Sequence, residues 1–181
     1  EVLRVVYRAK KGVDIDGYSS AAGRDGTLYL VHEVASDGMS TVRALSNDGV
    51  ALWSKDVHRR QDGLLGSSLV TLEEPKDGVW RCYIGSPETG NGHVSSFDIV
   101  TGELLASTRV PSGWSRPYLG EDIFLVGDIS GDNVDDIGCV RYSKWSAGIE
   151  EQGILVLDGL TLEVLRWWDL KHASRLWPQL V

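Results

Sequence analysis

Oxygen-bearing side chains alternate along one short stretch of this chain, residues 127–137. The side chains that follow this spacing belong to Asp128, Ser130, Asp132 and Asp136, and Val134 takes the alternate position between the last two. Hard cations prefer oxygen ligands from a flexible cage, and Ca²⁺ takes about six to eight of them. A loop that curls around an ion presents every second side chain inward, with the carbonyl of Val134 filling the gap before Asp136. The pattern therefore favours a calcium loop, with an acidic surface turn as the alternative.

The residues on either side of this stretch indicate which element must hold it. Residues 123–126 are Ile, Phe, Leu and Val, and residues 137–140 are Ile, Gly, Cys and Val. Both segments are typical of short buried strands, so we expect the acidic stretch to connect two strands of a hairpin. An EF-hand is excluded, because it requires a Glu at the last loop position and a helix on each side. Mg²⁺ is disfavoured because it keeps several waters.

The sequence G-D-I-S-G-D-N-V-D-D-I resembles the FG-GAP repeat of integrin alpha-subunit-type β-propellers, whose consensus runs roughly G-D-x-[ND]-G-D-G-x-x-D-[LI]. The resemblance implies side-chain ligands at Asp128, Ser130, Asp132 and Asp136, and a carbonyl ligand at Val134. Two positions depart mildly from the consensus, since Ser130 replaces Asn or Asp and Asn133 replaces Gly. The resemblance also implies that this calcium hairpin joins the first and second strands of a blade.

The composition bounds the protein class. The chain has 181 residues, 42% hydrophobic residues and a formal net charge of -8. This charge argues against a nucleic-acid or anionic-membrane partner, because either partner needs a basic face. No apolar run approaches the roughly 20 residues that span a bilayer. The first residues read as a strand and not as a signal peptide, so we expect a mature or excised segment. Cys82 and Cys139 fall in expected strands, which favours buried free thiols.

Three segments of the chain repeat the same order of strands and turns. The turn residue Asp77 lies 52 residues after Asp25 and 59 residues before Asp136. Likewise, Phe97 lies 52 residues after Leu45 and 60 residues before Leu157. Each segment contains four short runs of strand-forming residues separated by Gly, Asp, Asn or Ser. The sequence predicts an all-β protein made of four-stranded antiparallel β-propeller blades.

The hairpin at residues 44–53 carries a second resemblance. Its sequence A-L-S-N-D-G-V-A-L-W is similar to the PQQ-type (quinoprotein) propeller repeat, in which a Trp closes the blade. Asp and Gly supply the hairpin turn. We expect Trp53 to lie between two blades as a large apolar plate. The second and third segments have Ala106 and Arg166 at this position, so docking between those blades must differ.

The repeats divide the chain into three whole blades with a fragment at each end. The expected parts are the last strand of a preceding blade (1–14), blade 1 (15–57), blade 2 (58–110), blade 3 with the calcium hairpin (111–170) and the start of a further blade (171–181). Propellers have typically four to eight blades, so three do not close a ring. We expect either a fragment of a larger propeller or a partial ring completed by a partner, including a homo-oligomer.

The resemblance to FG-GAP propellers also implies an interaction surface, formed by the loops opposite the calcium hairpin. These loops are residues 33–40, 85–93 and 143–153, together with the blade connections 58–66 and 111–121. They carry His93, Trp114, Arg116 and Trp145. Exposed Trp and Arg are common anchors of binding surfaces. The alternative is that these side chains merely cover blade edges.

Catalytic patterns do not emerge from the sequence. The four His residues are scattered without zinc spacing, and no Gly-x-Ser-x-Gly elbow or phosphate-cradling glycine loop is present. We therefore expect a non-enzymatic scaffold with structural calcium that binds a protein or carbohydrate ligand. The expected setting is extracellular, periplasmic or at the cell surface, where calcium sites are of modest affinity. The alternatives are part of a quinoprotein dehydrogenase or calcium-dependent polysaccharide lyase, and the sensor domain of a membrane receptor.

Overall fold

Runs of β-branched and aromatic residues separated by Gly, Asp and Ser turns form strands throughout the described chain. The computed structural model describes residues 13–23, 26–35, 39–58, 68–72, 78–86, 93–109, 118–144 and 150–169. Within these ranges the regular elements are strands, and none forms a helix of the length and apolarity that a bilayer crossing needs. The strands are β1 (Val13–Gly23), β2 (Gly26–Ala35), β3 (Met39–Leu45), β4 (Ala51–His58), β5 (Ser68–Thr71), β6 (Arg81–Ser86), β7 (His93–Asp98), β8 (Leu104–Arg109), β9 (Tyr118–Gly127), β10 (Asp136–Lys144), β11 (Glu150–Leu157) and β12 (Val164–Asp169).

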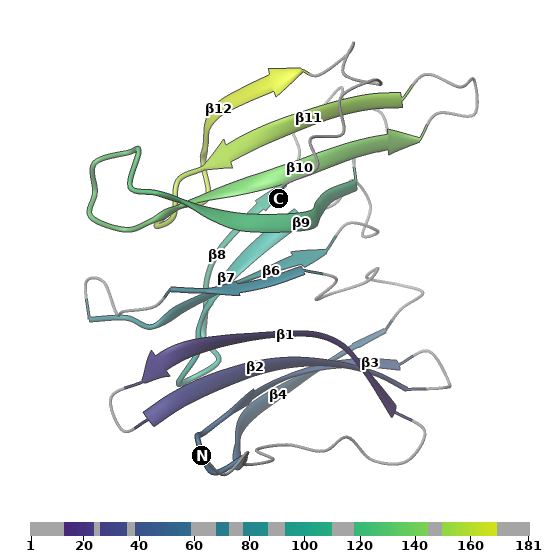
Figure 1. Ribbon diagram of the computed structural model, residues 1–181, viewed down its shortest axis with the longest axis vertical. Coiled ribbons are helices and arrows are strands. Elements are labelled where there is room, and N and C mark those ends of the chain that lie inside the picture. Colours follow the sequence, from purple (N-terminus) through teal and green to yellow (C-terminus); the bar gives the residue numbers. More distant parts are fainter. Residues whose placement is uncertain are drawn as a thin grey trace, which may run out of the picture.

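The strands form three four-stranded antiparallel sheets, each with its strands in chain order. We call β1–β4 sheet 1, β5–β8 sheet 2 and β9–β12 sheet 3. The sheets stack in chain order, with sheet 2 between the other two (Figure 1). The first strand of each sheet contacts the first strand of the next, β1 with β5 and β5 with β9. An amide–hydroxyl hydrogen bond of 2.9 Å from Ile123 N to Ser68 Oγ joins β9 to β5.

Two apolar clusters lie between the sheets, one at each interface. The cluster between sheets 1 and 2 consists of Val42, Ala44, Cys82, Ile84, Phe97 and Ile99, with Trp53, Leu69 and Trp80 packed against it. The cluster between sheets 2 and 3 includes Leu72, Tyr83, Val94, Ile123, Ile137, Cys139, Leu155, Leu157 and Leu162. Side chains alternate across each strand, so sheet 2 supplies one face to each cluster. Burial of these two clusters holds the stack together.

The last hairpins of sheets 2 and 3 close with the same side-chain-capped turn. Asp98 Oδ1 accepts hydrogen bonds from the amides of Val100 and Thr101 at 2.7 and 3.2 Å. Asp158 Oδ1 accepts from Leu160 and Thr161 at 3.0 and 2.7 Å. These carboxylates satisfy turn amides that would otherwise need solvent, as Asp side chains commonly do in turns. The two turns are therefore equivalent positions of a structural repeat.

The all-β class predicted from the sequence is confirmed. Trp53 lies between sheets 1 and 2, and both thiols are free and buried, as predicted. Burial raises the pKa of the Cys82 and Cys139 thiols. Of the expected end fragments 1–14 and 171–181, residues 1–12 and 171–181 lie outside the described residues, and Val13 and Asp14 belong to β1 of sheet 1.

Several expected element bounds need correction. Asp77, expected in the turn before the second strand of sheet 2, lies outside the described residues, and β6 begins at Arg81. The loop expected over residues 33–40 is shorter, because β2 continues to Ala35 and β3 begins at Met39. The loop expected over residues 143–153 is also shorter, because β10 continues to Lys144 and β11 begins at Glu150. Cross-strand pairing extends these strands past the residues that look like turns.

Candidate metal centre

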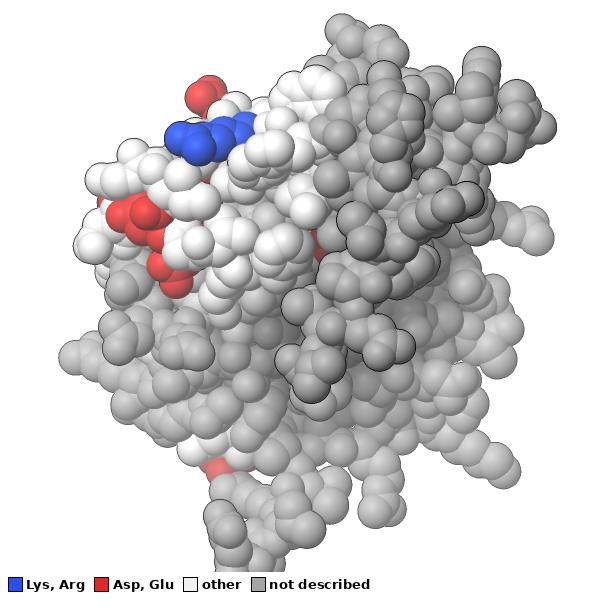
Figure 2. All heavy atoms as spheres, turned by 45° about the horizontal axis from the view of Figure 1, so that its top comes forward, with Lys and Arg blue, Asp and Glu red and all other residues white. Residues whose placement is uncertain are grey.

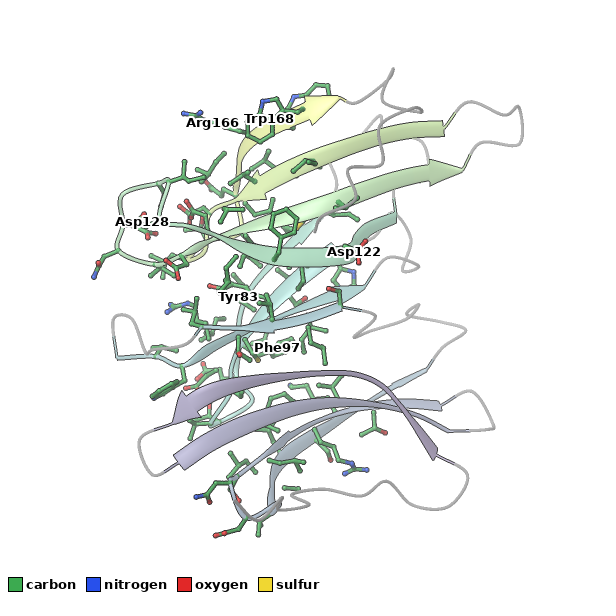
Figure 3. All side chains as sticks on the ribbon, in the orientation of Figure 1. Tyr83, Phe97, Asp122, Asp128, Arg166 and Trp168 are labelled. Atoms are coloured by element: carbon green, nitrogen blue, oxygen red, sulfur yellow. The ribbon has the colours of Figure 1, made fainter. Side chains whose placement is uncertain are left out.

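The acidic loop joins β9 to β10, the first and second strands of sheet 3. Figure 3 shows it projecting from the end of the sheet at Asp128. Gly127, Gly131 and Asn133 have backbone φ angles of 77, 85 and 71°. Gly and Asn are the residues that adopt this left-handed region most readily. The glycines and Asn133 thus let the chain curl tightly between the two strands.

Asp128 folds its side chain back into this loop. Its Oδ1 accepts from the amides of Gly131 and Asp132 at 2.6 and 3.2 Å and from Ser130 Oγ at 3.3 Å. Its Oδ2 accepts from Asn133 N at 2.8 Å. The amide of Gly131, followed by those of Asn133 and Asp132 and the Ser130 hydroxyl, holds the pKa of the Asp128 carboxyl below its ordinary value. The carboxylate is therefore negative at neutral pH and orders the loop around itself.

The second half of the loop is fixed by one polar and one apolar contact. Asp132 Oδ1 accepts from Val134 N at 2.8 Å. The Val134 side chain is 2% exposed and belongs to the cluster between sheets 2 and 3. Burying this side chain anchors an otherwise exposed loop to the core. The Asp132 carboxylate lies on the exposed part of the loop.

Asp136 is buried, with an exposed fraction of 0%. Its Oδ2 accepts from the amides of Ile129 and Ser130 at 2.7 and 2.8 Å. Its Oδ1 accepts from Gly159 N at 2.9 Å. A carboxylate offers about four acceptor positions, and three of them are used by backbone amides here. Asp136 therefore links the acidic loop to the β11–β12 turn of the same sheet.

Gly159 is the point where three segments meet, and the sequence reasoning missed it. A Cβ added at Gly159 would lie 2.2 Å from the Asp135 carbonyl oxygen and 3.0 Å from Val134 Cγ1. The Gly159 carbonyl also accepts from Tyr83 Oη on β6 at 2.9 Å. The acidic loop, the β11–β12 turn and sheet 2 are thus connected through one residue without a side chain. The sequence signal for this role was the glycine that stands two residues before Thr161, in a turn capped by a side chain.

The predicted ligands divide into two environments. Asp128, Ser130 and Asp132 are exposed, whereas Val134 and Asp136 are buried. Within the described part of the chain, no group of three or more His, Cys, Asp or Glu side chains gathers as a metal site. The hard oxygens of Asp128, Ser130 and Asp132 on one curled loop fit calcium by their chemistry. Calcium ligation by this set stays a prediction.

The predicted interaction surface is only partly described. His93 opens β7, pairs in register with Ser86 and Arg109, and is half-buried. Trp114, Arg116 and Trp145 lie outside the described residues.

Comparison of the chain with protein-family models and with curated proteins finds no match. We therefore infer the function from the motifs and the geometry of this chain.

Proposed function

We propose that this chain is a segment of a calcium-binding β-propeller that serves as an interaction scaffold for a protein or glycan ligand. The observation that carries the proposal is the acidic loop between the first two strands of the last of three stacked four-stranded sheets. Contacts between successive first strands support the propeller, because blades set around a central channel bring one strand of each blade close to that of the next. The proposed setting is extracellular, periplasmic or at the cell surface.

The calcium ion has a structural role in this proposal. Asp128, Ser130, Asp132 and Asp136 would supply side-chain oxygens, and Val134 its carbonyl. The bound cation supplies positive charge that lets several carboxylates share one short loop. Because Asp136 and Gly159 connect this loop to the β11–β12 turn and Tyr83, a stiffer loop stabilises the contact between sheets 2 and 3.

Thermal unfolding in calcium and in chelator tests the proposal. Calcium at about a hundred times its dissociation constant should add about 2.7 kcal/mol to the free energy of unfolding. The informative variant is Asp132→Asn, because an amide oxygen still accepts from Val134 N while the negative charge is lost. We expect this variant to lose most of the calcium-dependent rise in Tm and to match the wild type in chelator.

A matched control removes the same charge elsewhere on sheet 3. Asp122 is exposed on β9, at the opposite end of the strand from Asp128 (Figure 3). Asp122→Asn should keep the full calcium response. Equal Tm changes in calcium and chelator for Asp132→Asn, or an equal loss of response in both variants, would reject the calcium site. Activity on anionic glycans or after quinone reconstitution would instead favour a propeller enzyme.

A further inference from the structure

Among the described residues, two charged side chains are buried, and their charges are opposite. Arg81 is 5% exposed and Asp136 is 0% exposed. Arg81 opens β6 and Asp136 opens β10, so each stands at the start of the second strand of its sheet. Charged side chains are rarely buried unless opposite charges or hydrogen bonds compensate them. Neighbouring sheets thus carry opposite buried charges at the same position of the repeat.

The Arg81 side chain belongs to the face of sheet 2 that packs against sheet 3. Side chains alternate along a strand, so Arg81 shares this face with Tyr83. Tyr83 and Leu72 belong to the apolar cluster between sheets 2 and 3, and the Leu72 amide donates to the Arg81 carbonyl at 3.1 Å. Asp98 lies opposite Arg81 in register, and its carboxylate caps its own turn. The Arg81 charge is therefore enclosed at the interface between sheets 2 and 3.

The acidic loop meets this interface from the side of sheet 3. Its Val134 side chain is part of the same apolar cluster. Its Asp135 carbonyl oxygen would lie 2.2 Å from a Cβ at Gly159, and the Gly159 carbonyl accepts from Tyr83 Oη at 2.9 Å. Figure 3 shows Tyr83 between the two sheets. The start of β6 and the inner side of the acidic loop are thus connected through Tyr83 and Gly159.

The Tyr83 hydroxyl responds to charges from both sheets. Burial raises the pKa of this hydroxyl, the Arg81 charge lowers it, and the carboxylates of Asp135 and Asp132 raise it. The guanidinium and the loop carboxylates therefore act on the same buried group. Charges at a buried interface are screened by salt much less than exposed charges.

The other side of the acidic loop faces solvent. Asp128 and Asp132 are exposed, and Asp135 is half-buried. Figure 2 shows acidic atoms gathered on the surface at the side of sheet 3 where the loop projects. A cation from solution would reach the loop from this side, whereas Arg81 lies on the inner side. The loop is therefore placed between a fixed positive charge and the approach of a mobile one.

We propose that Arg81 is a resident counter-ion of the acidic loop and that it sets the affinity of the calcium site. Its positive charge balances part of the negative charge of the loop, so the loop keeps its fold at low calcium. The same charge repels Ca²⁺ and weakens its binding, which suits a site of the modest affinity typical of extracellular modules. This inference rests on the proposed calcium site and adds the residue that tunes it.

Calcium titration of Arg81→Met by calorimetry tests the inference, because Met keeps an apolar stem and removes the charge. The calcium dissociation constant should fall about tenfold, the effect of one unit charge acting through a partly screened interface. In chelator, the variant should have a lower Tm than the wild type, since the loop loses its counter-ion. Its calcium-dependent rise in Tm should be larger, because tighter binding stabilises more.

Two controls separate charge from shape and from net charge. Arg81→Lys keeps the charge and should bind calcium within about threefold of the wild type. Lys55→Met removes an equal charge between sheets 1 and 2, where the ammonium lies 5.1 Å from the centroid of the Phe97 ring. It should leave the calcium affinity unchanged.

Arg81→Gln is a second neutral variant, because its amide still donates hydrogen bonds to buried neighbours. Circular dichroism reports whether each variant is folded. If both neutral variants fail to fold and Arg81→Lys folds, the charge itself is required and the counter-ion role is supported. If Arg81→Lys also fails to fold, the shape of Arg81 is what matters and the inference is overturned.

The remaining outcomes separate this inference from the calcium site itself. Unchanged calcium affinity in the folded neutral variants, with equal Tm losses in calcium and in chelator, rejects the role of Arg81 and leaves the calcium site standing. A wild type that shows no heat of calcium binding and no rise in Tm rejects the calcium site, and the tuning role with it.

Discussion

At both interfaces between sheets, one large side chain fills the same position of the repeat. It comes from the preceding sheet at the first interface and from the turn of the following sheet at the second. Between sheets 1 and 2, the Trp53 ring fills the space of a Gly102 side chain, with a distance of 2.7 Å from its Cγ to a Cβ built there. Between sheets 2 and 3, the equivalents are Ala106 and Leu162, and Leu162 is 1% exposed in the apolar cluster. At the first interface, a large residue on the sheet faces a glycine in the turn. At the second interface, a small residue on the sheet is paired with a leucine in the turn.

The arrangement at the second interface, with a leucine in the turn, strains the backbone. Leu162 has a φ of 60°, where a residue with a Cβ costs about 1–2 kcal/mol. Burying a Leu side chain contributes about 1.5–3 kcal/mol, which offsets this strain. Loss of the repeated Trp therefore does not open the interface, because the turn supplies the missing volume.

The two interfaces also differ in what they connect. At the first, Trp53 packs near Phe97, with ring centroids 6.3 Å apart, and its N–H binds Ile99. At the second, Gly159 receives Tyr83 on its carbonyl and Asp136 on its amide. The acidic loop is thus part of the second interface alone. Changes in the loop should be felt between sheets 2 and 3 and not between sheets 1 and 2.

Trp53→Ala should give the largest effect, because it removes both the packed ring and the hydrogen bond of the first interface. For a half-buried Trp we expect a loss of about 3 kcal/mol in the free energy of unfolding, measured by urea denaturation. Trp167→Ala, which truncates a Trp that is 51% exposed, should cost less than about 1 kcal/mol. Equal losses would show that the first interface does not depend on Trp53.

Gly159→Ala should destabilise the second interface by about 2 kcal/mol, because the new Cβ would lie 2.2 Å from the Asp135 carbonyl oxygen. The backbone must shift at the point that joins the loop, the turn and Tyr83. Gly78→Ala is the control, since no atom lies within 4 Å of its added Cβ and only its left-handed φ is penalised. Denaturation in chelator measures the free energy of unfolding of both variants. A smaller loss of this free energy for Gly159→Ala than for Gly78→Ala would contradict the role of Gly159 as a junction.

Gly102→Leu should cost about 1–2 kcal/mol less in a Trp53→Ala background than in the wild type. In the wild type the new side chain collides with the Trp53 ring, whereas without the ring it fills the cavity as Leu162 does. A double-mutant cycle measures this coupling energy. If the free-energy changes of the two substitutions were strictly additive, a leucine in the turn would not be able to replace the Trp on the sheet.

Acidification should loosen only the loop of the second interface. The pKa of the folded Asp128 carboxyl is lowered, chiefly by the Gly131 amide. Its contribution is therefore present above the unfolded pKa of about 3.9 and is lost as the pH falls through the folded value. Amide exchange protection of Gly131 and Asn133 should drop below about pH 4.

The Gly49 amide serves as the internal control for this experiment, because it donates to the Ser46 carbonyl, which does not titrate. Its protection factor should stay constant over the same range. Asp128→Asn should remove the pH dependence at Gly131. A parallel fall in protection at Gly49 would show global unfolding and not a response of the loop.

Local spacing was enough to predict the strands, the hairpin that carries the acidic loop and the place of Trp53 between sheets. These features depend on residues close together in the chain, such as the alternation along β10 and the turn chemistry of Asp98 and Asp158. Gly78 lies in a turn, as expected, and β6 begins three residues later at Arg81. The strand itself is set by pairing with β7.

The sequence by itself determined an all-β chain with repeated hairpins and an acidic, left-handed loop at residues 127–136. Only the tertiary structure decided that Asp136 is enclosed by the amides of Ile129, Ser130 and Gly159, and that Leu162 replaces a missing Trp. The physical reason is distance along the chain. Asp136 and Gly159 are 23 residues apart, and Tyr83 and Gly159 are 76 residues apart, so packing of whole sheets brings them together.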